Sequence, residues 1–275
     1  MNKNEINILF KKFRKKEEII NITDYSNGCD QKVYLIETKN NKYILKKPIK
    51  EISKINNEEF CIELLSEKNL PIPKLIYKNN EFLIESYIEG EILNENQDLS
   101  LYRELGKYIS IIHSVKMKGF DEFNEKGEGI YKSEGIRDWF SPENPSIINC
   151  PILKKFDIIS LIKNNSYLLD SHTSVLLHGD LKNGNIIYYK NKISGIIDFG
   201  DAIAGPPEID LAHYYIFTED IKVWNSFIEG YNTKFNIRKM YFYVFALCLW
   251  LIYDNFINEN DSKYKKFLES VEYLN

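Results

Sequence analysis

The sequence of 275 residues predicts an α+β fold, and three patterns carry the prediction. Apolar and polar residues alternate over 33–38 and 42–47, on either side of the polar residues 39–41, which is typical of a β-hairpin. Two short β-branched and aromatic runs, 186–189 and 193–197, predict a second hairpin around a polar turn. Several other segments repeat apolar residues with helical spacing, which predicts amphipathic helices.

The remaining elements are expected at defined places along the chain. They are a helix over 51–69, a strand over 82–87, a helix over 101–113, a helix over 208–217 and an apolar helix over 240–253. The apolar helix is shorter than the roughly 20 residues that span a bilayer, so we expect it to be buried against the helix that contains Leu211.

The most informative segment runs from His178 to Asp201 and reads HGDLKNGNIIYYKNKISGIIDFGD. In its first part, Asp180 follows the histidine, and Asn185 follows that aspartate after the four residues LKNG. Its second part ends in D-F-G, which begins with Asp198. The order H-x-D-x-x-x-x-N followed by D-F-G is the pattern of a phosphoryl-transfer site.

Each of these residue types has a use in phosphoryl transfer, which depends on positioning and on the stabilisation of negative charge. A carboxylate at Asp180 can orient an acceptor hydroxyl and take its proton. The hard oxygen atoms of Asn185 and Asp198 can hold Mg²⁺. The hairpin is expected to return Asp198 to the side of Asn185, so that one metal ion contacts both. His178 is expected to hydrogen-bond the catalytic loop or the segment at Asp198.

Each residue also has a purely structural interpretation. His178 can be a buried histidine, Asp180 a turn residue and Asp198 a cap at the end of a strand. Any one of them taken alone favours that interpretation. Their joint order and spacing favour the phosphoryl-transfer site.

With Gly179 between the histidine and the aspartate, the segment resembles the aminoglycoside phosphotransferase and choline kinase group of small-molecule kinases, which read H-G-D or H-N-D here. The resemblance covers nearly the whole chain and implies a protein-kinase-like fold of two lobes. Residues 1–89 would form a small antiparallel-sheet lobe that binds nucleotide and ends in a hinge. Residues 90–275 would form a mainly helical lobe with the catalytic loop, the metal site and the acceptor site. Lys182 differs from the pattern of the small-molecule kinases and matches that of the protein kinases, which makes it a candidate auxiliary phosphate contact.

The resemblance also implies a phosphate-binding lysine on a strand and a helix glutamate that pairs with it. The strand KYILKKP offers Lys46, with Lys47 as the alternative, because side chains alternate between the two faces of a strand. The helix offers Glu58 and Glu59, and the family's spacing to the following L-P-x-P segment favours Glu58. Glu59 would then face solvent.

Further nucleotide contacts are implied on either side of that pair. Ser26, Asn27 and Gly28 would offer backbone and side-chain donors to phosphate oxygens, although the same run also fits an ordinary hairpin turn. The backbone of Glu85 and Tyr87 would hydrogen-bond the nucleotide base at the hinge, and Gly90 would let the chain turn into the helical lobe.

Three residues outside the central pattern are expected to support it. Asp210 matches the family's D-L-A aspartate and would brace the catalytic loop. Asp201 would brace the loop or meet the acceptor. His113 is expected to be structural rather than catalytic.

Composition indicates what kind of protein and which cell compartment this site belongs to. An apolar content of 44% in this length suits one enzyme with a sizeable core. The four cysteines, Cys29, Cys61, Cys150 and Cys248, lack metal-binding spacing, which favours reduced thiols in the cytoplasm. The N-terminal residues lack the apolar core of a signal peptide. A net charge of -4, without a basic stripe, argues against nucleic acid as a partner.

Acidic residues give a hint about the acceptor. The stretch 81–143 is rich in acids, which would attract a polycationic acceptor if they border the site. The alternative is a simple acidic surface. The candidates are Glu122, Glu125, Glu128, Glu219 and Asp220.

The resemblance therefore predicts an ATP- or GTP-dependent small-molecule O-phosphotransferase that uses Mg²⁺. The acceptor would be an aminoglycoside or related antibiotic, as in an antibiotic-resistance enzyme, or else a metabolite such as choline, homoserine or a methylthio sugar. A nucleotide-binding regulatory protein without catalysis and a protein kinase are the two other classes. The choice between ATP and GTP stays open, because backbone groups and pocket shape read the base.

Overall fold

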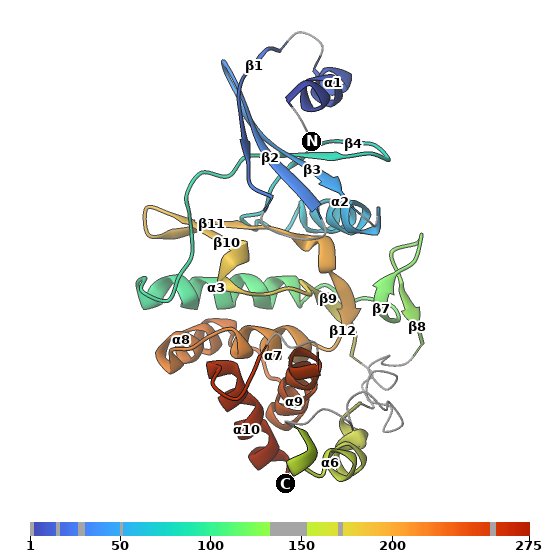
Figure 1. Cartoon of the computed structure of the whole chain (residues 1–275), viewed down its shortest axis with the longest axis vertical. Helices are drawn as coiled ribbons and strands as arrows, with labels where there is room; N and C mark the ends of the chain where they lie inside the picture. Colours follow the sequence, from blue (N-terminus) through green and yellow to red (C-terminus); the bar gives the residue numbers. More distant parts are fainter. Residues whose placement is uncertain are drawn as a thin grey trace. The chain divides into compact units, whose positions relative to one another are not determined.

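The computed structural model describes residues 3–14, 17–26, 31–49, 52–132, 153–169, 173–253 and 257–275 (Figure 1). It divides into two compact units. Unit 1 comprises Met1–Ile92 and Ile186–Asp201, and unit 2 comprises Leu93–Asn185 and Ala202–Asn275. The hairpin that carries Asp198 thus groups with the N-terminal residues, whereas the sequence analysis assigned the whole metal site to residues 90–275.

Unit 1 is built on an antiparallel sheet with strand order β1-β2-β3-β5-β4. Its elements are α1 (Lys3–Phe13), β1 (Ile19–Asp24), β2 (Gln31–Thr38), β3 (Lys42–Pro48), α2 (Ser53–Leu65), β4 (Leu75–Lys78), β5 (Leu83–Ser86), β6 (Glu91–Ile92), β10 (Ile186–Tyr189), β11 (Lys192–Ile196) and the 3-10 turn η4 (Phe199–Asp201). The two predicted hairpins and the strand before Gly90 are confirmed. Helix α2 ends before the predicted residue 69, where Asn69 has a φ of 54° and Pro71 follows.

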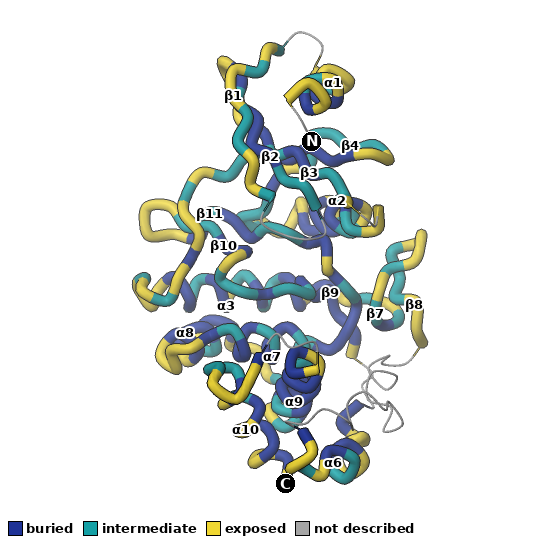
Figure 2. The backbone as a smooth tube through the Cα atoms, viewed as in Figure 1, coloured by how far each residue is buried: buried dark blue, intermediate teal, exposed yellow. Residues whose placement is uncertain are grey.

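One face of this sheet packs against α1, a helix that the sequence analysis did not predict. Ile6 and Phe10 of α1 are buried against Tyr34, Leu45 and Ile84 of the strands. Figure 2 shows β2 and β3 as a mixture of buried and intermediate residues, with the outer side of α1 exposed. The core of unit 1 therefore lies between α1 and the sheet.

The opposite face of the sheet carries polar side chains. Because side chains alternate along a strand, the neighbours of Leu45 point away from α1. The register pairs Ile44 with Glu85 and Lys46 with Leu83 across β3 and β5. Residues paired across strands share a face, so Lys46 and Glu85 lie together on the side away from α1.

The hairpin of β10 and β11 is joined by a two-residue turn. Lys190 and Asn191 have φ values of 50° and 59°, as the favoured type I′ turn requires. Strand β10 also pairs with β6, next to Gly90. Gly90 has a φ of +147°, and a Cβ there would lie 2.3 Å from the carbonyl oxygen of Tyr188. Only glycine fits this turn, which confirms the expectation for Gly90.

Unit 2 is mainly helical, with a small sheet of strand order β8-β7-β12-β9. Its elements are α3 (Leu99–Ile112), β7 (Phe120–Phe123), β8 (Gly129–Tyr131), η1 (Leu153–Lys155), α6 (Ile158–Asn165), η2 (Ser166–Leu169), β9 (Val175–Leu177), η3 (Asn183–Asn185), β12 (Ile203–Gly205), α7 (Glu208–Ile216), α8 (Ile221–Tyr231), α9 (Ile237–Tyr253) and α10 (Ser262–Leu274). Helices α3, α7 and α9 match the predicted ones, and α6, α8 and α10 were not predicted.

Helix α9 is the apolar centre of unit 2. It is buried along most of its length (Figure 2) and packs against α7 and α10. Tyr215 of α7 and Tyr241 of α9 contact edge to face at 5.9 Å between ring centroids. The predicted packing of this helix against the segment with Leu211 is confirmed. Among the described residues, no helix has the length and apolar character needed to cross a membrane.

Helices α3 and α8 approach closely at two glycines. A Cβ on Gly106 would lie 2.0 Å from the carbonyl oxygen of Phe227, and one on Gly230 would lie 1.8 Å from that of Arg103. Side chains at these positions would force the helices apart. This contact also sets the distance between His113, which caps α3, and Tyr231 at the end of α8.

We therefore expect Gly230→Ala to destabilise the protein. The clash with a backbone atom should cost up to about 3 kcal/mol, and the better helix propensity of alanine returns about 1 kcal/mol. The expected net loss is about 2 kcal/mol, measured by thermal or urea unfolding. Gly184→Ala is the control, because the nearest atom to its Cβ is 3.9 Å away on the side chain of Lys182. Equal stability of the two variants would contradict the close helix contact.

Candidate active site

The catalytic-loop residues lie between β9 and β10, in a turn that Gly179 makes with a φ of +81°. The carboxylate of Asp180 accepts hydrogen bonds from two side chains of the same loop. Lys182 Nζ lies 2.7 Å from its Oδ2, and Asn185 Nδ2 lies 2.9 Å from the same atom. The Asn185 amide also donates to the backbone carbonyl of Asp180 at 2.8 Å. The loop thus holds its acid, amide and lysine together.

Helix α7 braces this loop from one face. Asp210 accepts hydrogen bonds from the backbone N–H groups of His178 at 2.7 Å and Gly179 at 3.0 Å. One turn later on α7, the ring of His213 contacts the carbonyl oxygen of Leu181 at 3.0 Å. The predicted bracing role of Asp210 is confirmed.

Asp210 is itself held by a buried chain of hydrogen bonds. Its Oδ2 lies 3.1 Å from Nε2 of His113, whose Nδ1 lies 3.0 Å from the hydroxyl of Tyr231. Burial alone would raise the pKa of Asp210, but the hydrogen bonds and charge of its neighbours lower it below its usual value. The structural role expected for His113 is confirmed. His178 contacts the loop as expected, because its Nδ1 accepts from the backbone N–H of Asp180 at 3.4 Å.

A buried lysine with carboxylate partners lies in unit 1. Lys46 Nζ is 2.5 Å from Glu58 Oε1 and 3.4 Å from Glu85 Oε2. Burial alone would lower the pKa of Lys46, but the negative charges of Glu58, Glu85 and Asp198 raise it above its usual value. Burial and repulsion by Glu85 raise the pKa of Glu58. The predicted ion pair of Lys46 with Glu58 is confirmed.

The sequence analysis expected the backbone of Glu85 to contact a nucleotide base, and the structure places that backbone within the sheet of unit 1. Strand β5 is interior, and Glu85 is paired with Ile44 on one side and Leu75 on the other. Its backbone polar groups therefore belong to the sheet. The distinctive group is the side chain, which is 2% exposed and has no hydrogen-bond partner at Oε1 among the described residues. Tyr87 follows the strand, and its backbone contact stays a prediction.

The D-F-G segment is fastened to α2. Asp198 has a φ of +68°, a left-handed conformation that aspartate tolerates better than most residues. The N–H of Phe199 lies 3.4 Å from Glu58 Oε1, and Asn57 donates to the carbonyl of Gly200 at 3.1 Å. Asp201 pairs with Lys54 of α2. Its expected contact with the catalytic loop or with the acceptor stays a prediction.

The expected phosphate loop has little support in its described part. The hydroxyl of Ser26 both accepts from and donates to the backbone of Val33, at 3.0 and 3.3 Å, and its N–H donates to Asp24. These bonds give Ser26 the structural role of closing the β1–β2 hairpin, and its contact with phosphate stays a prediction. Asn27 and Gly28 lie outside the described residues.

Several other expectations concern charged surface residues and cysteines. Glu59 is not simply solvated, because Lys78 lies 2.5 Å away. Among the candidate acceptor-binding acids, Glu128 pairs with Lys118 and Asp220 caps α8, whereas Glu122 and Glu125 are exposed. Glu219 accepts from Ser262. Cys61 and Cys248 are free and buried, and Cys29 and Cys150 lie outside the described residues.

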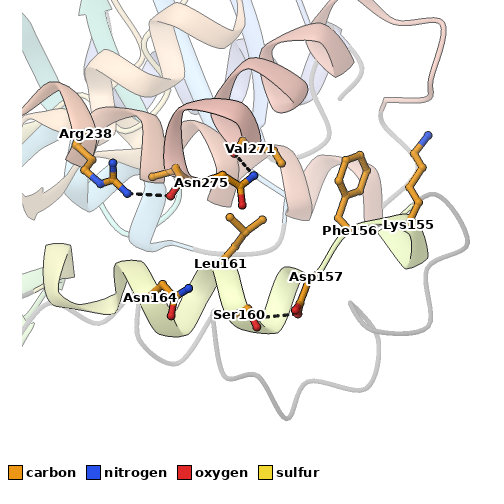
Figure 3. Close-up of a pocket in the computed structure, with 10 residues that line it drawn as sticks. Lys155, Phe156, Asp157, Ser160, Leu161, Asn164, Arg238, Val271 and Asn275 are labelled. Atoms are coloured by element: carbon orange, nitrogen blue, oxygen red, sulfur yellow. Dashed lines mark hydrogen bonds between the residues drawn. The ribbon is translucent and has the colours of Figure 1, made fainter.

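A pocket of about 400 Å³ lies elsewhere in unit 2, among α6, α9 and α10 (Figure 3). Its polar groups are largely engaged in structural bonds. Asp157 caps α6 through the N–H of Ser160, and Arg238 donates to the carbonyl of Leu274 at 2.8 Å. No lining residue belongs to the catalytic loop or to α7.

Two functional candidates escaped the sequence analysis. The side chain of Glu85 was detectable from the sequence, because it is an acid within the apolar run FLIES. Side chains alternate between the two faces of a strand, which puts Glu85 on the sheet face that carries Lys46. His213 was also detectable, because it lies one helical turn after Asp210 and so faces the same loop. Its Nε2 is 3.7 Å from Asp180 Oδ1.

An antiparallel sheet with a buried lysine–glutamate pair, followed by helices around an H-G-D loop, defines a phosphotransferase of protein-kinase-like α+β fold. The comparison with known families agrees. Residues 21–243 match the model of the phosphotransferase enzyme family, and the chain belongs to that family.

Individual relatives are more distant. A homoserine kinase of Bartonella tribocorum (strain CIP 105476 / IBS 506) is 24% identical over 191 residues, which are 62% of this chain and 56% of the kinase. Two solved structures are similar over nearly their whole length. The aminoglycoside phosphotransferase APH(4)-Ia has a TM-score of 0.73 at 13% identity, with 98% of this chain and 96% of that chain covered. The ADP-bound APH(2'')-Ib has a TM-score of 0.68 at 21% identity, with 99% and 98% covered. At these identities the likeness shows the fold.

The bracing by Asp210 predicts a large loss of stability in Asp210→Asn. The side-chain amide of the asparagine would point an N–H group at a donor that now hydrogen-bonds to the carboxylate. The free energy of unfolding should therefore fall by about 3 kcal/mol. Asp98→Asn is the control, because this exposed cap of α3 accepts one N–H, which asparagine does equally well.

The effect of Asp210→Asn should also depend on pH. A carboxyl with a lowered folded-state pKa stabilises the protein above its unfolded pKa and loses that contribution as the pH falls. The difference in unfolding free energy between wild type and Asp210→Asn should therefore have its full size at neutral pH and become smaller below pH 3.8. Urea unfolding at several pH values measures it, and a difference that grows with acidity would contradict the bracing.

Proposed function

We propose that this protein transfers the γ-phosphoryl group of ATP or GTP to a hydroxyl of a small cationic molecule, with an aminoglycoside or related antibiotic as the leading acceptor. The observation that carries the proposal is the loop in which Asp180 is held together with Lys182 and Asn185. In this mechanism, Asp180 orients the acceptor hydroxyl for in-line attack on the γ-phosphorus.

Lys46 is the proposed contact to the nucleotide phosphates, positioned by Glu58. The support is its burial and its 2.5 Å ion pair, which fix the direction of a flexible side chain. Lys182 is an auxiliary phosphate contact, and Tyr87 contacts the base through its backbone. A nucleotide donor is in keeping with the ADP-bound state of the similar APH(2'')-Ib structure.

The donor set suits Mg²⁺. Both contacts that Asn185 makes to Asp180 use its amide nitrogen, which leaves its carbonyl oxygen for a cation. Ile186 follows Asn185 directly in the chain and pairs with Ile196, two residues before Asp198. The described residues hold no cluster of three or more acids, histidines or cysteines fit for a metal. A Mg²⁺ site needs few protein ligands, because the ion keeps several waters and binds substrate phosphates. When bound, Mg²⁺ would neutralise the negative charge of the phosphates.

Aminoglycosides lead as acceptors because of the similar structures, and the net charge of -4 favours a cationic molecule. The match to a homoserine kinase favours a second candidate, an amino alcohol of metabolism. Choline and methylthio sugars belong to the same alternative.

A transfer panel tests the proposal. The purified protein is incubated with Mg²⁺ and γ-labelled ATP or GTP, and with aminoglycosides, homoserine, choline, methylthioribose or a peptide. Label on an aminoglycoside would support the leading acceptor, and label on an amino alcohol or sugar would support the alternative. Label on the peptide alone would favour a protein kinase. Nucleotide binding without transfer to any acceptor would favour a regulatory protein and contradict the proposal.

Asp180→Ala should lower the transfer rate by about 10³-fold, because the hydroxyl loses the group that orients it. Nucleotide affinity should change little, since this carboxylate serves the acceptor. Steady-state rates and a nucleotide-binding titration measure the two effects. Near-normal turnover would remove Asp180 from the mechanism.

Asp198→Ala should weaken Mg²⁺-dependent nucleotide binding as well as the rate. The apparent metal affinity should fall by at least the roughly tenfold that is typical for lost support of a metal site. Asp201→Ala is the matched control, because this neighbouring acid pairs with Lys54. The measurement is nucleotide binding across a Mg²⁺ titration. An unchanged metal dependence in Asp198→Ala would exclude Asp198 as a ligand.

A further inference from the structure

His213 presents one ring nitrogen to the loop backbone and the other to Asp180. Nδ1 lies 3.0 Å from the carbonyl oxygen of Leu181. A carbonyl oxygen only accepts hydrogen bonds, so Nδ1 carries the hydrogen. In the neutral ring, Nε2 therefore has a free lone pair, and it lies 3.7 Å from Oδ1 of Asp180. This separation is too long for a hydrogen bond between the two atoms.

The surroundings keep the ring neutral. The ring of Phe217 stacks on it at 4.8 Å between centroids, and the side chain is 17% exposed. In the described part of the chain, the charged groups that face the ring are Asp180 and Lys182 from the catalytic loop and Asp210 on its own helix. Burial lowers the pKa of His213 below its usual 6.5, despite the nearby carboxylates.

The lone pairs of the Asp180 carboxylate are more fully used in hydrogen bonds than the lone pair on Nε2 of His213. Its Oδ1 accepts from Lys182 at 2.9 Å, and its Oδ2 accepts from Asn185 and contacts the same lysine. Two acceptor atoms that face each other without a hydrogen between them form a place for a donor, and the acceptor hydroxyl that Asp180 orients is such a donor.

We propose that Nε2 of His213 receives the proton of the acceptor hydroxyl, which makes His213 a further catalytic residue of the proposed phosphotransferase. This inference rests on the proposed function. The hydroxyl oxygen forms a bond to the γ-phosphorus, and the bond from that phosphorus to the β,γ-bridging oxygen breaks with its electron pair on the nucleoside diphosphate. The proton moves to Nε2 and leaves to solvent from the exposed edge of the ring.

The test is the pH profile of turnover in three proteins, with Mg²⁺-ATP and the acceptor found in the transfer panel. His213→Asn keeps a donor at the place of Nδ1 and removes the base. Tyr214→Phe removes another loop brace, the 2.9 Å bond to Asn183, and removes no base. Wild type should lose turnover as the pH falls through the lowered pKa of His213, below 6.5. His213→Asn should turn over about 100-fold more slowly and lack this acid limb, with an unchanged KM for ATP.

Tyr214→Phe should retain the acid limb even where its rate is reduced. The inference is overturned if His213→Asn keeps the wild-type limb, or if its rate falls no further than that of Tyr214→Phe. NMR of the imidazole groups provides a second readout that needs no acceptor. It should show a His213 ring with hydrogen on Nδ1 and a pKa below 6.5. A ring with hydrogen on Nε2 would overturn the inference even if the panel finds no acceptor, and absence of transfer by wild type would separately overturn the proposed function.

Discussion

The buried carboxylate of Asp210 is the constraint on which the catalytic loop depends. It accepts two successive backbone N–H groups, at His178 and Gly179, at the point where the positive φ of Gly179 reverses the chain. Without this acceptor, two buried donors would lack partners, at about 1–3 kcal/mol each. Its third partner, His113, links the loop to α3 and α8. The position of Asp180 is therefore set from the core of unit 2.

The polar clusters around Asp210 and around Lys46 differ in how well their hydrogen-bonding groups are satisfied. Around Asp210, each donor has an acceptor, and the pKa of the carboxyl is lowered. Around Lys46, several carboxylates share one ammonium group, and in the part of the chain that the structure describes, one buried oxygen of Glu58 and one of Glu85 have no hydrogen-bond partner. Unsatisfied buried acceptors are costly and are retained in few places. The cluster around Asp210 stabilises a backbone turn, whereas the cluster around Lys46 holds a buried ammonium group among carboxylates, as its proposed role as a phosphate contact requires.

The order of the site residues could be read from the sequence because their spacing is local. A loop of eight residues brings Asp180 and Asn185 together in any fold that preserves it, and strand alternation separates Lys46 from Lys47. The partners of Ser26 and Glu85 could not be read in this way. Whether the hydroxyl of Ser26 closes a hairpin, or the backbone of Glu85 belongs to a sheet interior, depends on strand order and pairing. Residues 133–152, which carry part of the acid-rich stretch, lie outside the described residues.

Lys182 departs from the small-molecule kinase pattern, and its contact with Asp180 explains how it can serve two partners. The lysine side chain is 39% exposed and the aspartate 21%, so solvent screens their attraction. Ion pairs of this exposure contribute about 1 kcal/mol or less, a small fraction of what a phosphate group with several negative charges offers the same ammonium. In the ligand-free loop, Lys182 keeps the carboxylate oriented. In the proposed mechanism, Lys182 turns to the phosphate of a bound nucleotide at little cost, while Asn185 still holds the carboxylate of Asp180.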